Sequence, residues 1–388
     1  MTLKSNQVEV RNPDFVVFSD DWGEHPSSCQ HIFRHIARNH RVLWVNTIGM
    51  RNPTLSWTDA RKVVVKVSKM LRIERDAANY RNEEPVSVCQ PFMLPGSRSR
   101  LVRAFNARTV IGKVRALLDN FNMSEAVVVT TVPNASEYPK LLEGRKVIYY
   151  CVDDFSLWPG LDADVVREME SRLIEKATSI ITVSDTLFQR LSTSGKPTHL
   201  LTHGVDLALF STIAESELSI LDKIPKPRAG FFGLIDGRMD WHLVVSIAQR
   251  MPHVSFVFAG PVDASAGDLP EVPNIHFIGR VNYENLPSLI AGLECLLLPY
   301  RTGELSEAIS PLKLKEYLST GKLVVSSPIA EARKWAGVLH IASTLDQWVE
   351  ALTLEDRSVG VSHRVLMQSR LAEESWEQKA ATFLEMCK

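Results

Sequence analysis

Short runs of β-branched and other apolar residues recur along the chain and indicate β-strands. The runs are DFVVFS (14–19), RVLWVN (41–46), AVVVTT (126–131), KVIYY (146–150), SIITVS (179–184), RAGFFGL (228–234), VSFVFAG (254–260), ECLLLPY (294–300) and KLVVSS (322–327). Nearly all are followed by helical spacing or by a Ser, Asp or Pro helix start. Apolar strands that alternate with helices predict parallel sheets covered on both faces.

These elements predict two domains. A dozen strands fit two sheets of about six better than one sheet, and a chain of 388 residues favours two cores. The alternation breaks at 215–230, where Pro225 and Pro227 come just before a new strand. We expect an α/β fold of two Rossmann-like, doubly wound parallel-sheet domains facing a central cleft, at residues 1–205 and 206–365. A terminal helix at 366–388 is expected to pack back on the first domain.

Composition narrows the class of protein. The five cysteines are an odd number without a C-x-x-C pair, so neither a disulfide framework nor a zinc site is expected and a cytoplasmic protein fits best. No apolar run approaches the roughly 18 residues of a membrane span, so we expect a soluble or peripheral protein. Residues 1–125 carry 19 Lys and Arg against 12 Asp and Glu, and the remainder carries 25 against 33. This asymmetry indicates an anionic partner for the first half, or only an uneven solvated surface.

Ligands of doubly wound sheets bind beyond the carboxyl ends of the strands. The loop after the first strand, at 20–40, contains neither G-x-G-x-x-G nor G-x-x-x-x-G-K-[ST], which argues against NAD chemistry and Walker-type ATP hydrolysis. Ser27 or Ser28 fits a helix cap there. This leaves His25 and His31 as candidates on the acceptor side, with a solvated or satisfied side chain as the alternative for His31.

Two adjacent aspartates follow the strand KVIYY. Asp153 and Asp154 are well placed for a general base, and only one of them is expected to face the cleft, because successive strand side chains point to opposite faces. Trp158 nearby suits stacking on a sugar. The alternative is that Asp154 or Ser156 simply begins a turn.

The loop after the strand RAGFFGL offers groups for a phosphate. Gly233 lets the backbone approach a ligand, and Arg238 presents a planar fork for phosphate oxygens. On its own this pattern is weak, because a single surface arginine is usually solvated.

The stretch EAISPLKLKEYLSTGKLVVSS (307–327) predicts a helix followed by a strand. We expect Ser310 at the N-cap and Pro311 at the first helical position, so the amides of Leu312 and Lys313 point out of the helix start. A helix N-terminus with a nearby lysine suits a diphosphate, with Lys313 as its ligand. A capped surface helix is the alternative reading.

We expect Glu316 and Lys315 of this helix to face different surroundings. Glu316 lies about one turn after Lys313 and could accept hydrogen bonds from a ribose diol. Lys315, two positions after Lys313, should point elsewhere and is expected to be solvated.

Several segments of the sequence resemble motifs of the GT-B glycosyltransferases. SPLKLKEYLSTGKLVVSS is similar to their nucleotide-sugar signature, and ITVSDTLFQRL and HGVDLALF are similar to their V-S-x-x-L and N-G-V-D-x-x-x-F motifs. NIHFIGRVNYENLPSLIAGLECLLLPYR is similar to the strand and helix near the base. The segments DWGEHPSSCQHIFRHIARNHRVLWVN and YYCVDDFSLWPG resemble a bacterial subgroup linked to surface and exopolysaccharide assembly.

The resemblance implies roles for particular residues. Glu316 would bind ribose, Lys313 and Arg238 would neutralise the diphosphate, and the 279–283 loop with Arg280 would flank the base. Asp153 or Asp154 would lie against the sugar.

The sequence also departs from the family pattern. Ala308 stands where many retaining members have a first glutamate, and Glu307 and Glu304 are the candidates to substitute for it. Leu323 replaces the usual proline of the signature. Asp153 replaces an expected histidine, so the stereochemical outcome stays open.

The resemblance implies transfer of a sugar from a nucleoside diphosphate donor to a hydroxyl of a glycan or lipid-linked acceptor. We expect no metal or other cofactor, because cations and helix amides can stabilise the leaving diphosphate. Asp154 is the first choice as the base of an inverting reaction, and a retaining reaction needs none. A sugar-nucleotide epimerase and a binding protein with a decayed catalytic group are the alternatives. Nucleic-acid binding is not expected.

The segment 97–121 carries six basic residues. Its apolar positions are Leu101, Phe105, Ile111, Val114, Leu117 and Leu118. A basic amphipathic helix can lie on an anionic membrane, which predicts a peripheral protein at the inner face of the cell membrane. A surface helix that packs its apolar face on the sheet is an equal alternative.

Overall fold

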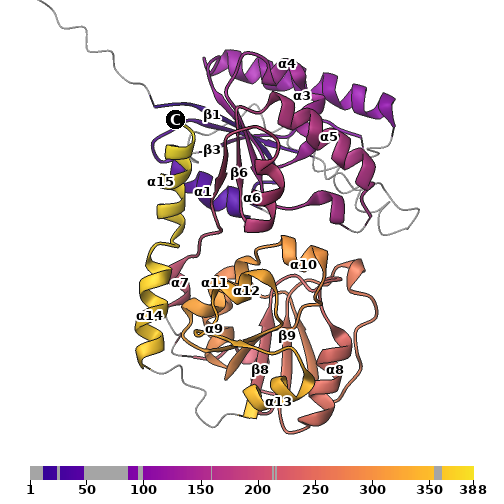
Figure 1. Cartoon of the computed structure of the whole chain (residues 1–388), viewed down its shortest axis with the longest axis vertical. Helices are drawn as coiled ribbons and strands as arrows, with labels where there is room; N and C mark the ends of the chain where they lie inside the picture. The colour runs from indigo at the N-terminus through magenta and orange to yellow at the C-terminus, as the bar shows by residue number, and fades with distance from the viewer. Residues whose placement is uncertain are drawn as a thin grey trace, which may run out of the picture. The chain divides into compact units, whose positions relative to one another are not determined.

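The computed structural model describes residues 12–23, 27–47, 86–94, 99–158, 160–211, 214, 216–353 and 361–388. It contains two parallel sheets, each in its own compact unit and each flanked by helices (Figure 1). The first unit comprises residues 1–182, 188–200 and 380–388, and the second comprises residues 183–187 and 201–379. The predicted α/β fold with two doubly wound sheets is confirmed, and a strand occurs at each of the nine apolar runs.

The first sheet has seven parallel strands in the order β3-β2-β1-β4-β5-β6-β7. The strands are β1 (Phe15–Ser19), β2 (Val42–Asn46), β3 (Val86–Cys89), β4 (Val127–Thr130), β5 (Val147–Cys151), β6 (Ser179–Thr182) and β7 (Thr198–Leu200). The associated helices are α1 (Ser28–Ile36), α3 (Arg100–Asn120), α4 (Pro139–Leu142), α5 (Ala163–Lys176) and α6 (Asp185–Ser192). All residues of β1, β2, β4, β5 and β6 are buried, as continuous apolar strands in a covered parallel sheet should be.

The second sheet has six parallel strands in the order β10-β9-β8-β11-β12-β13. The strands are β8 (Arg228–Phe232), β9 (Ser255–Ala259), β10 (Ile275–Gly279), β11 (Cys295–Leu298), β12 (Leu323–Ser326) and β13 (His340–Ile341). The helices are α7 (Leu207–Phe210), α8 (Trp241–Arg250), α9 (Leu286–Ala291), α10 (Glu304–Ala308), α11 (Leu312–Ser319), α12 (Ala330–Lys334), α13 (Leu345–Thr353) and α14 (Val361–Ala372). The strand order reverses between β8 and β11, so ligands are expected beyond the carboxyl ends of these two strands.

The two strands at this reversal pair over only part of their length. In β8, Ala229 and Gly230 pair with β11, whereas all five residues of β8 pair with β9. Beyond Gly230, the hydroxyl of Tyr317 on α11 accepts from the Phe232 N–H at 3.0 Å and donates to the Phe232 carbonyl at 3.1 Å. Tyr317 thus satisfies the backbone groups of a buried strand end, which would otherwise be costly to bury. The contact fixes α11 at the reversal point.

The break between the two units lies earlier than the 215–230 segment suggests. By contacts the second unit begins at Leu201, and it also includes Val183–Leu187. The segment with Pro225 and Pro227 belongs to the second unit, because Phe210, Leu221 and Ile224 are buried in that unit's core. The interrupted alternation of strands and helices at 215–230 therefore marks an irregular segment within the second unit.

The end of the chain contains two helices where one was expected. α14 ends at Ala372 and α15 spans Trp376–Met386 (both yellow in Figure 1). Residues 380–388 belong to the first unit by contacts. There the Phe383 ring lies 5.6 Å from the Phe33 ring and 5.5 Å from the Tyr150 ring, measured between centroids.

Candidate donor-binding site

The candidate site of the second unit lies at the reversal between β8 and β11. Gly233 directly follows β8 and has a φ of +131°, and Gly260 directly follows β9 and has a φ of +151°. A Cβ on Gly260 would lie 1.8 Å from the Gly233 carbonyl oxygen. Both positions therefore require glycine, which lets the ends of β8 and β9 approach closely at the carboxyl edge of the sheet.

Lys313 of α11 reaches this edge. Its Nζ donates to the Tyr300 hydroxyl at 2.8 Å and lies 4.7 Å from the centroid of the Phe231 ring. A Cβ on Gly233 would lie 2.4 Å from Lys313 Cε, so the lysine stem lies directly over the glycine. The amine is therefore held beside the strand end by a neutral hydroxyl and by aromatic rings that favour a cation.

Arg238 meets the same tyrosine. Its guanidinium carbon lies 5.3 Å from the Tyr300 ring centroid, and its Nη2 lies 2.6 Å from an oxygen of the buried Asp236. The structure thus brings Arg238, Lys313 and Gly233 together around Tyr300. Tyr300, the last residue of the run ECLLLPY, was not among the predicted site residues, because a tyrosine after a strand carries no motif.

Glu316 lies on the same helix one turn after Lys313. Its half-buried side chain interacts electrostatically with Lys313 and with Asp206, which caps α7 by accepting from the Leu209 N–H at 3.0 Å. Burial raises the pKa of Glu316 to about 7, Lys313 lowers it and Asp206 raises it. This carboxyl group therefore changes its protonation state near neutral pH.

The start of α11 differs from the expectation. The helix begins at Leu312 with Pro311 as the N-cap, and no side chain caps it. Ser310, the expected cap, lies one residue too early and is buried. Pro311 has an extended backbone with ψ of 119°, and the residue before a proline also avoids the helical region, so the helix starts one residue later. The N–H groups of the first turn thus have no side-chain cap.

The positions considered for a further glutamate have other contacts. Ala308 is buried, and its carbonyl accepts from Ser184 Oγ at 2.8 Å. The Glu307 carbonyl accepts from Thr186 Oγ1 at 2.9 Å, and the Glu307 carboxylate pairs with Arg333. Glu304 lies exposed in the first turn of α10.

Lys315 is not solvated, contrary to the expectation. It is 2% exposed and forms an ion pair with Glu374. The prediction failed because helical spacing shows that Lys315 faces away from Lys313, but it does not show what lies on that other side. Arg280, by contrast, lies exposed after β10.

In the first unit, Asp154 follows β5 and caps a short 3₁₀-helix, Phe155–Leu157. Its Oδ1 accepts from the Ser156 N–H at 3.1 Å and from Ser156 Oγ at 2.6 Å, and its Oδ2 lies 3.4 Å from Arg190 Nε. These contacts fit the alternative that Asp154 begins a turn. Asp153 is half-buried, and its carbonyl accepts from Cys151 Sγ. The catalytic role of either aspartate stays a prediction.

The acceptor-side candidates belong to the first unit. His31 lies in α1 and is 9% exposed. Burial, together with Arg34 and His35, lowers its pKa to about 4, so His31 is neutral at pH 7. Trp158 is half-buried just after the 3₁₀-helix, and His25 lies outside the described residues.

Metal and membrane features can be stated for the described part of the chain. No group of three or more His, Cys, Asp or Glu side chains there could hold a metal ion. Within the same residues, every helix is too short or too polar to cross a membrane.

Comparisons with known proteins agree with this fold. The family model described as "Glycosyl transferases group 1" matches residues 236–353. TuaH of Bacillus subtilis (strain 168), described as a candidate glycosyltransferase of teichuronic acid biosynthesis, is 28% identical over 225 residues, which are 53% of this chain and 56% of TuaH. The match thus spans little more than half of that relative.

Solved structures extend the likeness to nearly the whole chain. Sucrose-phosphate synthase from Thermosynechococcus elongatus has a TM-score of 0.68 at 13% identity, covering 97% of this chain and 98% of its own. Anabaena HepE in complex with UDP and glucose has a TM-score of 0.64 at 14% identity, covering 97% and 99%. The chain therefore has the GT-B glycosyltransferase fold. The residues that match the group 1 glycosyltransferase family model, 236–353, all lie in the second unit.

Glu316 gives a pH-dependent prediction. Because its pKa is about 7 in the folded protein and near 4.5 in the unfolded chain, the folded protein binds this proton more strongly, and the stability contribution falls as pH rises from about 4.5 to 7. Glu316→Gln should therefore raise the unfolding midpoint by about 2–4 °C at pH 8 and change it little at pH 5.

Thermal unfolding followed by circular dichroism at both pH values measures this difference. Glu304→Gln, which removes an exposed carboxylate of α10, is the matched control and should give the same small shift at both pH values. A shift for Glu316→Gln that is equal at pH 5 and pH 8 would contradict the prediction.

Proposed function

We propose that this protein is a glycosyltransferase that moves a sugar from a nucleoside diphosphate to a hydroxyl acceptor. The observation that carries the proposal is the position of the Lys313 amine, which lies over Gly233 at the strand reversal and donates to Tyr300 at 2.8 Å. Ligands of doubly wound sheets bind at this point. The match of residues 236–353 to a glycosyltransferase family supports it independently.

The chemistry follows from the charge of the leaving group. When the bond between the anomeric carbon and the donor phosphate breaks, the diphosphate gains negative charge. Lys313 and the amides at the start of α11 would bind the diphosphate more strongly in the transition state, where its negative charge is greater, than in the ground state of the donor. This difference would lower the barrier. An ammonium group has three donors, so the bond to Tyr300 leaves Lys313 able to bind phosphate oxygens. We propose that the reaction needs no metal.

Arg238 and Glu316 complete the proposed donor site. Arg238 would add a second cation beside the diphosphate while Asp236 holds its orientation. Glu316, ionised above about pH 7, would accept hydrogen bonds from the ribose diol. In an inverting reaction, Asp153 or Asp154 would take the acceptor proton as the new bond to the anomeric carbon forms.

The identities of the substrates are proposed from the relatives. HepE was solved with UDP and glucose, and a trehalose-6-phosphate protein from E. coli, with a TM-score of 0.61, was solved with UDP-2-fluoro glucose. TuaH is described for teichuronic acid biosynthesis. We therefore propose a UDP-sugar donor and an acceptor that is a glycan or lipid-linked intermediate of cell-surface polysaccharide synthesis.

Part of α3 suits contact with an anionic membrane. Val110, Val114 and Leu118 are buried, so this half of the helix packs within its own unit. The first half differs, because Leu101 is 84% exposed and Phe105 is 42% exposed, four residues apart on one helix face. Arg100 and Arg108 are exposed on the same helix.

Leu94 is another exposed apolar residue, and its backbone is bonded to this helix. It is 38% exposed, and Asn106 holds it by two hydrogen bonds, of 2.7 and 2.8 Å, to its backbone N–H and carbonyl. We propose that Leu94, Leu101 and Phe105, which we call the apolar patch, enter the membrane interface while nearby arginines bind anionic headgroups. Such contact would bring the enzyme to a lipid-linked acceptor.

Nucleotide binding tests the donor site. In calorimetric titration, wild-type protein should bind UDP, and Lys313→Met should raise the Kd by at least about tenfold, because a charged hydrogen bond to phosphate is lost. Lys223→Met, at an exposed position of the same unit, should leave the Kd unchanged. Equal Kd values for wild type and Lys313→Met would contradict the site.

NMR of a UDP-sugar with an acceptor panel tests the reaction itself and reports transfer and the product anomer. An epimerised sugar formed without acceptor would instead identify an epimerase.

Vesicle sedimentation tests the membrane contact. Wild-type protein should sediment with phosphatidylglycerol–phosphatidylcholine vesicles and much less with phosphatidylcholine alone. Leu101→Ser with Phe105→Ser should weaken binding by about tenfold or more, because two apolar side chains no longer enter the interface. Ile220→Ser is the matched control, since Ile220 is 48% exposed in the second unit. Equal binding to both lipid mixtures, or no loss in the double variant, would contradict the contact.

A further inference from the structure

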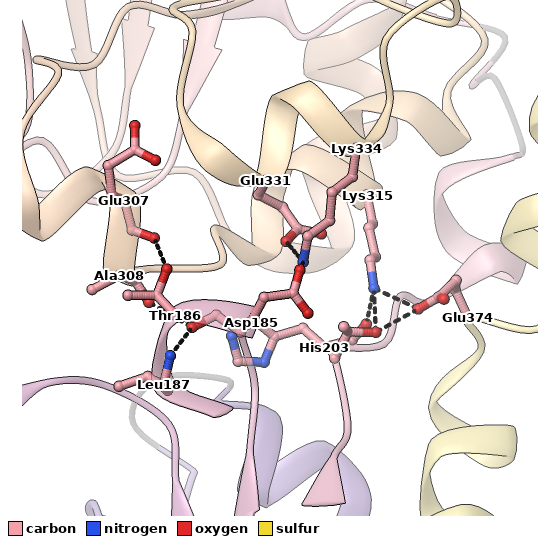
Figure 2. A network of polar contacts seen from close by, with 12 residues as sticks. Asp185, Thr186, Leu187, His203, Glu307, Ala308, Lys315, Glu331, Lys334 and Glu374 are labelled. Carbon is pink, nitrogen blue, oxygen red and sulfur yellow. Dashed lines mark hydrogen bonds and ion pairs between the residues drawn. The ribbon is translucent and has the colours of Figure 1, made fainter. Parts of the chain in front are cut away.

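Lys315 is a buried lysine in the middle of α11, the helix that also carries the proposed donor ligands Lys313 and Glu316. Its Nζ donates to Thr202 Oγ1 at 3.0 Å, to the His203 carbonyl, and to the carboxylate of Glu374 (Figure 2). An ammonium group has three donors, and these three contacts use all of them. The amine is thus held by one hydroxyl, one carbonyl and one carboxylate.

A second lysine shares two of these partners. Lys379 Nζ lies 2.7 Å from the same Glu374 oxygen and donates to Thr202 Oγ1 at 3.0 Å. Burial alone would raise the pKa of Glu374, but the two lysines outweigh it and hold that pKa below the ordinary value. We call Lys315, Glu374, Lys379 and Thr202 the ionic cluster.

The surroundings of the ionic cluster add one neutral and one acidic group. The side chain of His203 is buried, and burial and the two lysines lower its pKa to about 3, so it carries no charge at pH 7. Glu331 of α12 is 3% exposed, attracts Lys315 electrostatically, and pairs with Lys334 at 3.1 Å. The cluster thus holds two lysines and one carboxylate, and Glu331 is a second acidic group near Lys315.

The partners of Lys315 lie where the chain enters and leaves the second unit. The unit's main segment begins at Leu201, next to Thr202, and ends at Lys379. The two ends are also joined to each other, since the Val205 N–H donates to the Glu374 carbonyl at 2.8 Å. Lys315 thus fastens α11 to both ends of the segment.

The remaining crossing of the chain, Val183–Leu187, is attached to neighbouring elements in a similar way. Ser184 and Thr186 donate to the carbonyls of Ala308 and Glu307, and Asp185 pairs with Lys334 at 2.8 Å (Figure 2). Two of these contacts fall on α10 and the third falls on α12. Every crossing segment is therefore bonded to elements around the donor helix.

Stability alone is a poor explanation for this arrangement. Burying an ion pair costs a desolvation energy that is comparable to the attraction gained, and apolar residues of similar size often replace such pairs without loss of stability. The three directed bonds do fix the rotation of α11 about its axis and its position along that axis. Lys313 and Glu316 are two residues before and one residue after Lys315, so their positions depend on how α11 is held.

We propose that Lys315 is a positioning residue of the donor site: it anchors α11 to the segments at which the chain enters and leaves the donor-binding unit, and so places Lys313 and Glu316. This inference rests on the proposed function. Lys315 does not contact the nucleotide itself. Its replacement should weaken nucleotide binding although Lys313 and Glu316 are unchanged.

The test compares UDP binding with stability in one set of variants. Lys315→Met should raise the Kd for UDP about tenfold, whereas Lys315→Arg, which keeps a charge for Glu374, should stay within about threefold of wild type. The triple variant with Lys315→Met, Glu374→Met and Lys379→Met removes every charge of the ionic cluster, so it leaves no unpaired buried charge and should regain the unfolding midpoint. It should nevertheless keep the raised Kd, because the bonds from α11 are still missing.

Lys226→Met is the control, since it removes a lysine that pairs with Glu217 at a more exposed place in the same unit. Its Kd should equal that of wild type. The inference is overturned if Lys315→Met binds UDP as wild type does, or if the triple variant regains both the midpoint and the Kd, which would show a purely structural role. Absence of UDP binding by wild-type protein would instead overturn the proposed function.

Discussion

The hydroxyl of Tyr317 completes the hydrogen bonding of Phe232 where β8 stops pairing with β11. A parallel sheet that opens at its strand reversal leaves buried backbone groups that need partners. Because a side chain of α11 supplies them, this helix cannot shift along the sheet without exposing the end of β8. This contact sets where α11 lies on the sheet, and the bonds of Lys315 would hold its rotation about the helix axis.

Two lysines of α11, two residues apart, differ in whether an acidic partner pairs directly with the amine. Lys313 donates to a neutral tyrosine hydroxyl at the sheet edge, so its charge is not cancelled by that partner. Lys315 is buried and paired with Glu374, so its charge is used within the protein. A cation near a helix N-terminus opposes the macrodipole, and an anionic ligand would offset that cost at Lys313.

The sequence predicted the parts of this structure that depend on local pattern. Nine apolar runs became strands because each is long and continuous, whereas β13, of two residues, is too short to show a period. Helical spacing put Lys313 and Glu316 one turn apart on a predicted helix, and both lie in α11. Lys315 was misread because Thr202 and Glu374 are 113 and 59 residues away in the chain. The cap of α11 was misplaced by one residue because Pro311 stays extended. Tyr300 was missed because a tyrosine after a strand carries no motif.

The central claim is that Lys313 and the start of α11 hold the diphosphate of a nucleotide donor. A crystal structure of the protein with UDP tests it most directly. The account predicts phosphate oxygens within hydrogen-bond distance of Lys313 Nζ and of the first amides of α11, with the ribose hydroxyls at Glu316. A bound UDP whose diphosphate lies away from α11, with ribose not at Glu316, would contradict it.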